Sequence, residues 1–136
     1  MVKSETSAYL EAVHFFRPRD VEMQIVMSGK IWEIRWHGRG GQGAITAAKL
    51  LAQAAYLDGY HGVTAAPSFG AERRGAPVSA STRISPEPIM VVSQVEEPVI
   101  VVVLDYTLLG YDDVTSGLRR GGWLVVNSQQ SPKELK

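Results

Sequence analysis

Two stretches near the start of the chain alternate between apolar and polar residues, which is the pattern of a strand with one buried face. Alternation over Val21–Met27 predicts one strand, and alternation over Ile31–Trp36 predicts a second, with two tryptophans and an isoleucine on its apolar side. Apolar residues at helical spacing over Ser4–Phe16 predict a helix upstream of both. The chain is therefore expected to open with a short helix and two strands.

A helical pattern occupies Ala44–Leu57, where small and apolar residues cover most of the surface of the predicted helix. Gly59 stands just past its end, at a position where glycine commonly stops a helix. We expect this helix to be largely buried. The next segment, Gly62–Ala66, predicts a short strand that ends before Pro67.

Apolar segments in the second half of the chain predict the rest of the sheet. Val78–Ile84 and Ile89–Val92 are close enough in sequence to form an antiparallel hairpin. The β-branched run within Val99–Asp105 is typical of a strand covered on both faces, and Gly122–Asn127 predicts a further buried strand. A short helical or turn segment over Thr107–Leu118 joins these two strands.

The mixture of strands and helices places the chain in the α/β class. We expect a three-layer α/β/α domain with a mixed, mostly parallel sheet and a Rossmann-like glycine loop after the first core strand. We assign this domain to residues 30–136 and an N-terminal extension to residues 1–29. Because little sequence follows the last strand, the domain is expected to be truncated at its C-terminal side.

Composition narrows the functional classes. The 136 residues carry 14 basic and 14 acidic side chains, and this balance gives no support to a nucleic-acid or membrane-surface role. No apolar run approaches the ~20 residues of a membrane span, and the N-terminus lacks the apolar core of a signal peptide, so we expect a cytoplasmic protein. Cysteine is absent, which excludes iron–sulfur clusters ligated by cysteines of this chain.

Glycines are concentrated between the strand that ends at Trp36 and the helix that begins at Ala44. The loop consists of Gly38, Arg39, Gly40, Gly41, Gln42 and Gly43, and three of its glycines match G-x-G-x-x-G. Free amide groups and the positive end of a helix dipole attract phosphate, so we interpret the loop as an anion site rather than only a tight turn. A dinucleotide site is less favoured, because no acidic residue follows the second strand and Asp58 precedes it.

A second group of turn and basic residues lies within Pro67–Pro77, where Arg73 and Arg74 are adjacent. Two neighbouring guanidinium groups suit a diphosphate or the carboxylates of a partner chain. A solvated arginine loop is the alternative. Loops that leave the carboxyl ends of neighbouring parallel strands converge, so we expect this loop and the glycine loop to share one ligand.

Other chemically active residues give weaker indications. We interpret His37 as a structural hydrogen-bonding residue, and Asp105 and the Asp112–Asp113 pair as capping or turn residues. The histidines have no companions at metal-ligand spacing. We therefore predict no catalytic residue and no metal ligand in this chain, and a binding role.

Three stretches, "IRWHGRGGQGAITAAKLLAQAAYLDG", "PSFGAERRGAPVSASTRI" and "EEPVIVVVLDYTLL", resemble in their order and spacing the gamma subunit of 2-oxoacid:ferredoxin oxidoreductases, especially the pyruvate type. The resemblance covers about Ile31 to Asn127. It implies one part of a multisubunit enzyme that oxidatively decarboxylates a 2-oxoacid, forms an acyl-CoA and reduces ferredoxin. In this family thiamine diphosphate lies between the alpha and beta subunits, and the iron–sulfur clusters lie mainly in the delta subunit.

The resemblance also implies a role for the two loops. It makes Gly38 to Gly43 a candidate cradle for the phosphates of coenzyme A, shared with partner subunits, and Arg73 and Arg74 candidates for binding phosphate or docking a partner. No cofactor is expected to be held by this chain alone. The N-terminal extension is longer than the family leader, which makes Met27 a candidate start. Two other classes stay open, a stand-alone NAD- or FAD-binding redox domain and a ligand-free assembly scaffold.

Overall fold

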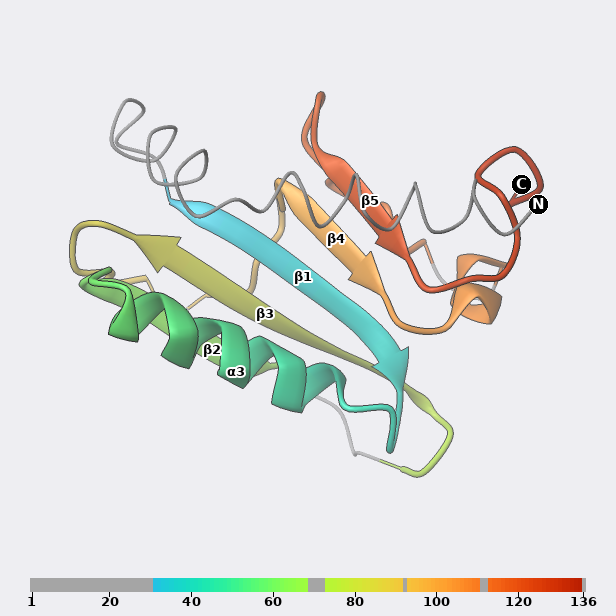
Figure 1. The fold of residues 1–136 in the computed structure, drawn as a ribbon, viewed down its shortest axis with the longest axis horizontal. Coiled ribbons are helices and arrows are strands. Elements are labelled where there is room, and N and C mark those ends of the chain that lie inside the picture. Colours follow the sequence, from blue (N-terminus) through green and yellow to red (C-terminus); the bar gives the residue numbers. More distant parts are fainter. Residues whose placement is uncertain (1–30, 69–72, 92, 111–112, 136) are drawn as a thin grey trace.

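The computed structural model of the chain contains one five-stranded sheet with the strand order β2-β3-β1-β4-β5 (Figure 1). It describes residues 31–68, 73–91, 93–110 and 113–135. The helix expected over Ser4–Phe16 and the strand expected over Val21–Met27 lie outside these residues. The elements are β1 (Trp32–Arg39), α3 (Ala44–Leu57), β2 (Gly62–Pro67), β3 (Pro77–Ser85), β4 (Ile100–Val103), the 3-10 helix η1 (Tyr106–Gly110) and β5 (Trp123–Val126).

The sheet is mixed because β3 alone runs against the other strands. β1 pairs with β4 and β4 with β5 in parallel, whereas β3 pairs antiparallel with both β1 and β2. In Figure 1 the arrowheads of β1, β4 and β5 point the same way and that of β3 points in the opposite direction. The predicted α/β class and the mixed, mostly parallel sheet are confirmed. The carboxyl ends of the parallel strands therefore meet at one edge of the sheet.

One face of the sheet packs against α3. The side of β1 that carries Trp32, Ile34 and Trp36 joins this core, as the alternation predicts. A polar link crosses it, because the Trp36 indole donates to Thr82 Oγ1 at 3.0 Å and that hydroxyl donates to the Ala48 carbonyl of α3 at 2.9 Å. The helix is thus fastened to the two central strands by a buried hydroxyl as well as by apolar contact.

The predicted bounds of α3 are confirmed, but the prediction that it is largely buried is wrong. Its buried residues are alanines only: Ala44, Ala48, Ala52 and Ala55. On its outer side Leu50 is 58% exposed and Leu57 is 85% exposed. The helix forms an outer layer, and the small side chains on one face let its backbone lie close to the sheet, while Leu51 packs against the core and Leu50 and Leu57 face outward.

The opposite face of the sheet is covered by η1 and the turns that follow it. Val101 and Val103 of β4 pack there against Leu108 and Val114. β5 lies at the edge of the sheet, where Trp123 is 46% exposed, so the prediction that this strand is buried is wrong. In the described part of the chain no helix is both long and apolar enough to cross a membrane.

The predicted hairpin between Val78–Ile84 and Ile89–Val92 is wrong. Both edges of β3 are already occupied, by β1 on one side and β2 on the other. Residues 89–91 therefore cannot pair with β3, and they form no strand; Met90 is 89% exposed. The first core strand also differs from its prediction, because β1 continues past Trp36 to Arg39.

Candidate functional site

The candidate site lies at the edge of the sheet where the parallel strands end. The glycine loop follows β1, Asp105 follows β4 and Asn127 follows β5. From β1 the chain passes through α3 to β2 on one side of the sheet, whereas from β4 it passes to β5 on the other side. Ligands of open α/β sheets bind at such a switch point, outside the carboxyl ends of the strands. Here that point lies between β1 and β4.

The first glycine of the motif belongs to the sheet rather than to the loop. Gly38 pairs with Val78 in the ladder between β1 and β3. A Cβ atom added to Gly38 would lie 3.3 Å from Ala44 Cβ, at the start of α3. Glycine at this position therefore serves the close approach of strand and helix.

The second glycine brings the two predicted loops together. Gly40 N–H donates to the Ala76 carbonyl at 2.8 Å, and Gly75 N–H donates to the Gly40 carbonyl at 3.1 Å. A Cβ atom on Gly40 would lie 2.2 Å from the Arg73 carbonyl oxygen. In a dinucleotide-binding loop the second glycine lets the pyrophosphate approach the backbone, but the backbone of Arg73 takes that space here. The Rossmann-like detail of the prediction is not confirmed.

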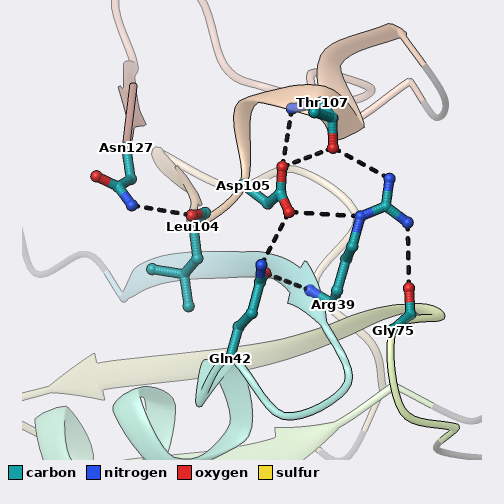
Figure 2. A network of polar contacts seen from close by, with 7 residues as sticks. All are labelled: Arg39, Gln42, Gly75, Leu104, Asp105, Thr107 and Asn127. Atoms are coloured by element: carbon teal, nitrogen blue, oxygen red, sulfur yellow. Dashed lines mark hydrogen bonds and ion pairs between the residues drawn. The ribbon is translucent and has the colours of Figure 1, made fainter. Parts of the chain in front are cut away.

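Three side chains form a closed network between the glycine loop and β4 (Figure 2). Gln42 accepts from Arg39 N–H at 2.7 Å and donates to Asp105 Oδ2 at 2.8 Å. Arg39 Nε lies 3.4 Å from the same Asp105 oxygen. The guanidinium also donates to the Gly75 carbonyl and to Thr107 Oγ1, each at 3.1 Å. Arg39 thus joins three separate segments of the chain.

Asp105 lies at the centre of this network. The sequence analysis interpreted this residue only as a capping or turn residue. It does accept from Thr107, from the backbone N–H at 3.0 Å and from Oγ1 at 2.6 Å. The bonds from Thr107 and Gln42, with the charge of Arg39, lower the pKa of Asp105 to about 2. The signal in the sequence was its place directly after a buried strand, but the partner that reaches it from 63 residues away is not visible there.

The groups that remain open to a ligand lie on the outer side of the loop. Gly43 is the N-cap of α3 with a φ of 88°, and no side chain caps the helix. The first-turn N–H groups, which lack intrahelical partners, therefore point outward at the positive end of the helix dipole. Arg73 and Arg74 are exposed, and among the described residues their side chains make no ion pair. This arrangement can bind an anion with several oxygens.

A separate hollow of about 400 Å³ lies on the sheet face opposite α3, with Arg35 and His37 of β1 in its lining. None of the predicted site residues lines it. Arg35 is already engaged there, because it donates to His37 Nε2 at 3.0 Å and to the carbonyls of Val114 and Ser116. His37 is thus hydrogen-bonded within its own strand, in agreement with its interpretation as a hydrogen-bonding residue.

Asp58, the acidic residue that a dinucleotide site would need for its ribose contact, lies far from the glycine loop in the structure. Asp58 is the C-cap of α3, at the far end of a helix of 14 residues, which is about 21 Å from the glycine loop at 1.5 Å per residue. β2 ends in Ala66 and Pro67, neither of which can bind ribose hydroxyls through a side chain. Across the described ranges, no three His, Cys, Asp or Glu residues are grouped so as to hold a metal ion.

The fold and the site define an α/β subunit with an anion-receptive loop at the carboxyl edge of its sheet. The sequence model of the family described as "Pyruvate ferredoxin/flavodoxin oxidoreductase" matches residues 33–136. The chain belongs to this family.

The relatives of this chain carry the names of subunits of pyruvate or ketoisovalerate oxidoreductases and of pyruvate synthase. It is 56% identical over 103 residues to the "Pyruvate/ketoisovalerate oxidoreductases common subunit gamma" of Thermococcus litoralis, covering 76% of this chain and 55% of that protein. It is 53% identical to "Pyruvate synthase subunit PorC" of Methanosarcina barkeri, covering 76% and 57%. The crystal structure of pyruvate oxidoreductase subunit PORC from Thermotoga maritima superposes with a TM-score of 0.66 at 44% identity, covering 78% and 55%. The chain spans about half the length of the relatives it matches.

Proposed function

We propose that this chain works as part of the gamma subunit of a 2-oxoacid:ferredoxin oxidoreductase, with pyruvate as the first candidate substrate. The whole enzyme would oxidatively decarboxylate the 2-oxoacid to an acyl-CoA and reduce ferredoxin. The family supports this assignment, and the names of the relatives above point to pyruvate or ketoisovalerate as substrates. We place the enzyme in the cytoplasm.

The division of chemistry among subunits follows from the side chains available here. Iron–sulfur clusters need thiolate ligands, and the sequence holds no cysteine. We assign the clusters to a delta subunit, and thiamine diphosphate, which would supply the carbanion chemistry of decarboxylation, to alpha and beta subunits. No catalytic residue is assigned to this chain.

We assign to this chain a share in binding coenzyme A. The observation that carries this proposal is the convergence of the glycine loop and the arginine loop, which are joined by two backbone hydrogen bonds at Gly40. Coenzyme A carries a diphosphate and a ribose phosphate, and the charges required to hold them are present in Arg73, Arg74 and the first turn of α3. The donor set therefore fits the group. Of the two alternative classes, the NAD- or FAD-binding domain has no counterpart for the ribose contact.

Kinetics of the assembled complex test this role. Arg73→Ala and Arg74→Ala, made singly, are expected to raise KM for coenzyme A about tenfold, because each removes one charge-assisted bond to phosphate. Arg120→Ala is the matched control, since Arg120 is also exposed but lies just before β5, at the opposite edge of the sheet. An unchanged KM for coenzyme A in both loop variants would contradict the proposal that this chain contributes to coenzyme A binding.

A share in subunit assembly is a second contribution, favoured by a different observation. Leu50 and Leu57 on α3 and Trp123 and Leu124 on β5 present apolar surface outward, and exposed apolar patches mark interaction sites. The proposed partners are the alpha, beta and delta subunits, with ferredoxin as the electron acceptor of the complex. Purification of the complex from its native source, followed by identification of the attached chains, tests this; recovery of the chain without them would contradict it.

A further inference from the structure

The residues of the glycine loop fall into two groups according to what their side chains or backbones already contact. Gly38, Arg39, Gly40 and Gln42 are committed to other parts of the chain, whereas Gly41 and Gly43 face open space. Building on the proposed coenzyme A role, we infer that Asp105 is a positioning residue which braces the loop through Arg39 and Gln42. The ligand phosphates are then bound by the backbone at Gly41 and Gly43, the first turn of α3, Arg73 and Arg74.

The contacts of Arg39 argue against a direct role in phosphate binding. Its Nε lies beside Asp105 at 3.4 Å, Nη1 donates to the Gly75 carbonyl at 3.1 Å, and Nη2 donates to Thr107 Oγ1 at 3.1 Å. All three nitrogens are thus engaged, and the positive charge is balanced by a neighbouring carboxylate. A phosphate that took the place of these partners would have to break the contacts of Arg39 to two other segments of the chain, the arginine loop at Gly75 and the segment after β4 at Asp105 and Thr107.

Gln42 is committed in the same way. Its amide oxygen accepts from the backbone N–H of Arg39 at 2.7 Å, and its amide nitrogen donates to Asp105 at 2.8 Å. Figure 2 shows the side chain of Gln42 turned toward Asp105. The amide oxygen therefore closes the turn of the loop itself, and the amide nitrogen holds the loop against Asp105, which follows β4.

The negative charge of Asp105 decides on which side of the loop a phosphate can lie. With four donors from Thr107, Gln42 and Arg39 around it, the carboxylate stays ionised at every pH at which such an enzyme works. A carboxylate repels phosphate at short range. The ligand is therefore directed away from Asp105, toward the outer side of the loop.

The outer side of the loop has the room that a ligand needs. A Cβ atom added to Gly41 or Gly43 would meet nothing within 4 Å among the residues that the structure describes, and both have positive φ, 91° and 88°. At Gly40, in contrast, an added Cβ atom would lie 2.2 Å from the Arg73 carbonyl oxygen. Gly40 is therefore closed by the chain itself, and Gly41 and Gly43 present their backbone to an open space beside Arg73 and Arg74.

The dependence of KM for coenzyme A on salt concentration separates a brace from a ligand contact. Each charge that contacts phosphate adds to the salt dependence, because ions screen that attraction. In the complex with its partner subunits, Arg73→Ala and Arg74→Ala are expected to raise KM and to flatten its rise between about 20 and 300 mM salt, a range over which the Debye length shrinks from about 20 Å to about 6 Å. Asp105→Asn, Arg39→Ala and Gln42→Ala are expected to raise KM about three- to tenfold, to leave the salt dependence as in the wild type, and to change kcat less than twofold.

A double-mutant cycle adds a second readout. Arg39→Ala and Asp105→Asn act on one network, so the double variant is expected to raise KM no further than the stronger single variant. Arg39→Ala combined with Arg73→Ala is expected to multiply the two effects. The milder Gln42→Ala variant removes two bonds without removing a charge, and it keeps the test open if either charge variant fails to assemble.

The outcomes distinguish this inference from the function on which it rests. A salt dependence flattened by Arg39→Ala as much as by Arg73→Ala would make Arg39 a ligand contact and overturn the inference while leaving the coenzyme A role intact. A lower KM in Asp105→Asn would show that Asp105 competes with the ligand, which also overturns it. Wild-type KM and salt dependence in both Arg73→Ala and Arg74→Ala would instead refute the proposed coenzyme A role.

Discussion

Replacing Gly40 by alanine tests whether the two loops depend on their close contact. The new Cβ atom would lie 2.2 Å from the Arg73 carbonyl oxygen and 2.9 Å from the Arg73 carbonyl carbon, where contacts under 3.0 Å essentially never occur. Both neighbours are backbone atoms, so no side chain can rotate to make room. The arginine loop must therefore move away from the glycine loop by about 1 Å, the shortfall from ordinary van der Waals contact.

The cost follows from what that movement breaks. Overpacking costs about 1–3 kcal/mol, and the bonds of Gly40 to Ala76 and Gly75, at 2.8 and 3.1 Å, are worth about 1 kcal/mol each. Alanine also restricts the unfolded chain, which offsets about 0.4–1 kcal/mol. We expect Gly40→Ala to lower the free energy of unfolding by about 3 kcal/mol.

Urea unfolding followed by tryptophan fluorescence measures this change, with Gly41→Ala as the matched control. Gly41 has a φ of 91° but nothing within 4 Å of an added Cβ atom, so alanine there adds about 1 kcal/mol of backbone strain without a clash. Gly40 itself is not among the glycines with positive φ, so equal losses in the two variants, at unchanged m-value, would show that the close contact with Arg73 costs no more than the backbone strain at Gly41 and would refute the expected clash. A larger loss at position 40 together with a raised KM for coenzyme A would connect the contact to the site.

Three further predictions concern single side chains. The pKa of Asp105 falls from 3.8 to about 2 on folding, so this carboxylate stabilises the fold above about pH 4, and the stabilisation is lost as pH falls through 2. Asp105→Asn should therefore reduce the change in the free energy of unfolding between pH 5 and pH 2 by about 1 kcal/mol, after allowance for solvent screening. Urea titrations over that pH range measure this change. Thr82→Val should cost about 1–3 kcal/mol by the same assay, because it leaves the Trp36 indole without its hydroxyl partner in the core, whereas Thr82→Ser should restore most of the loss. Arg83→Met should cost about 1–3 kcal/mol, since it leaves Glu33 with Arg119 alone at 3.5 Å and removes the bonds from Arg83 to the carbonyls of Ser93 and Gln94. A melting temperature within about 2 °C of wild type, roughly the shift of a fraction of 1 kcal/mol, would contradict it.

The parts of the fold that depend on local sequence were predictable. The helix pattern over Ala44–Leu57 gives the bounds of α3 because glycines flank it, Gly43 and Gly59, and both adopt the positive φ that ends regular helix geometry. The alternation in β1 likewise predicts which side faces the core. In both cases the information lies within a few residues of the element itself.

Which strands are neighbours was not predictable from adjacent sequence. Residues 89–91 carry the apolar pattern of a strand, but β3 is already paired on both edges by elements that precede it in the chain. The predictions of which apolar residues are buried were wrong for the same reason. Leu57 and Trp123 are apolar in sequence, yet they lie on an outer helix face and an edge strand, and only the arrangement of layers determines that.

In the candidate site, too, one feature was predicted from the sequence and another was not. The convergence of the two loops was predicted from the rule for neighbouring parallel strands, but β1 and β2 are not neighbours. The loops meet because β3, which begins where the arginine loop ends, pairs with the end of β1. The involvement of Asp105 could not be predicted, since it depends on Gln42 and Arg39 reaching across from β1 to the end of β4. Spacing in sequence carries no information about such a contact.

The position of β3 between β1 and β2 has a consequence for how the chain folds as it is synthesised. β1, α3 and β2 emerge first, but the two strands cannot pair, because they stand one strand apart, about 10 Å from each other. Until residues 77–85 leave the ribosome, both strands expose unpaired edges and the alanine face of α3 has an incomplete surface to pack on. The nascent chain is therefore open to association with other molecules over this interval, and insertion of β3 closes both strand edges in one step.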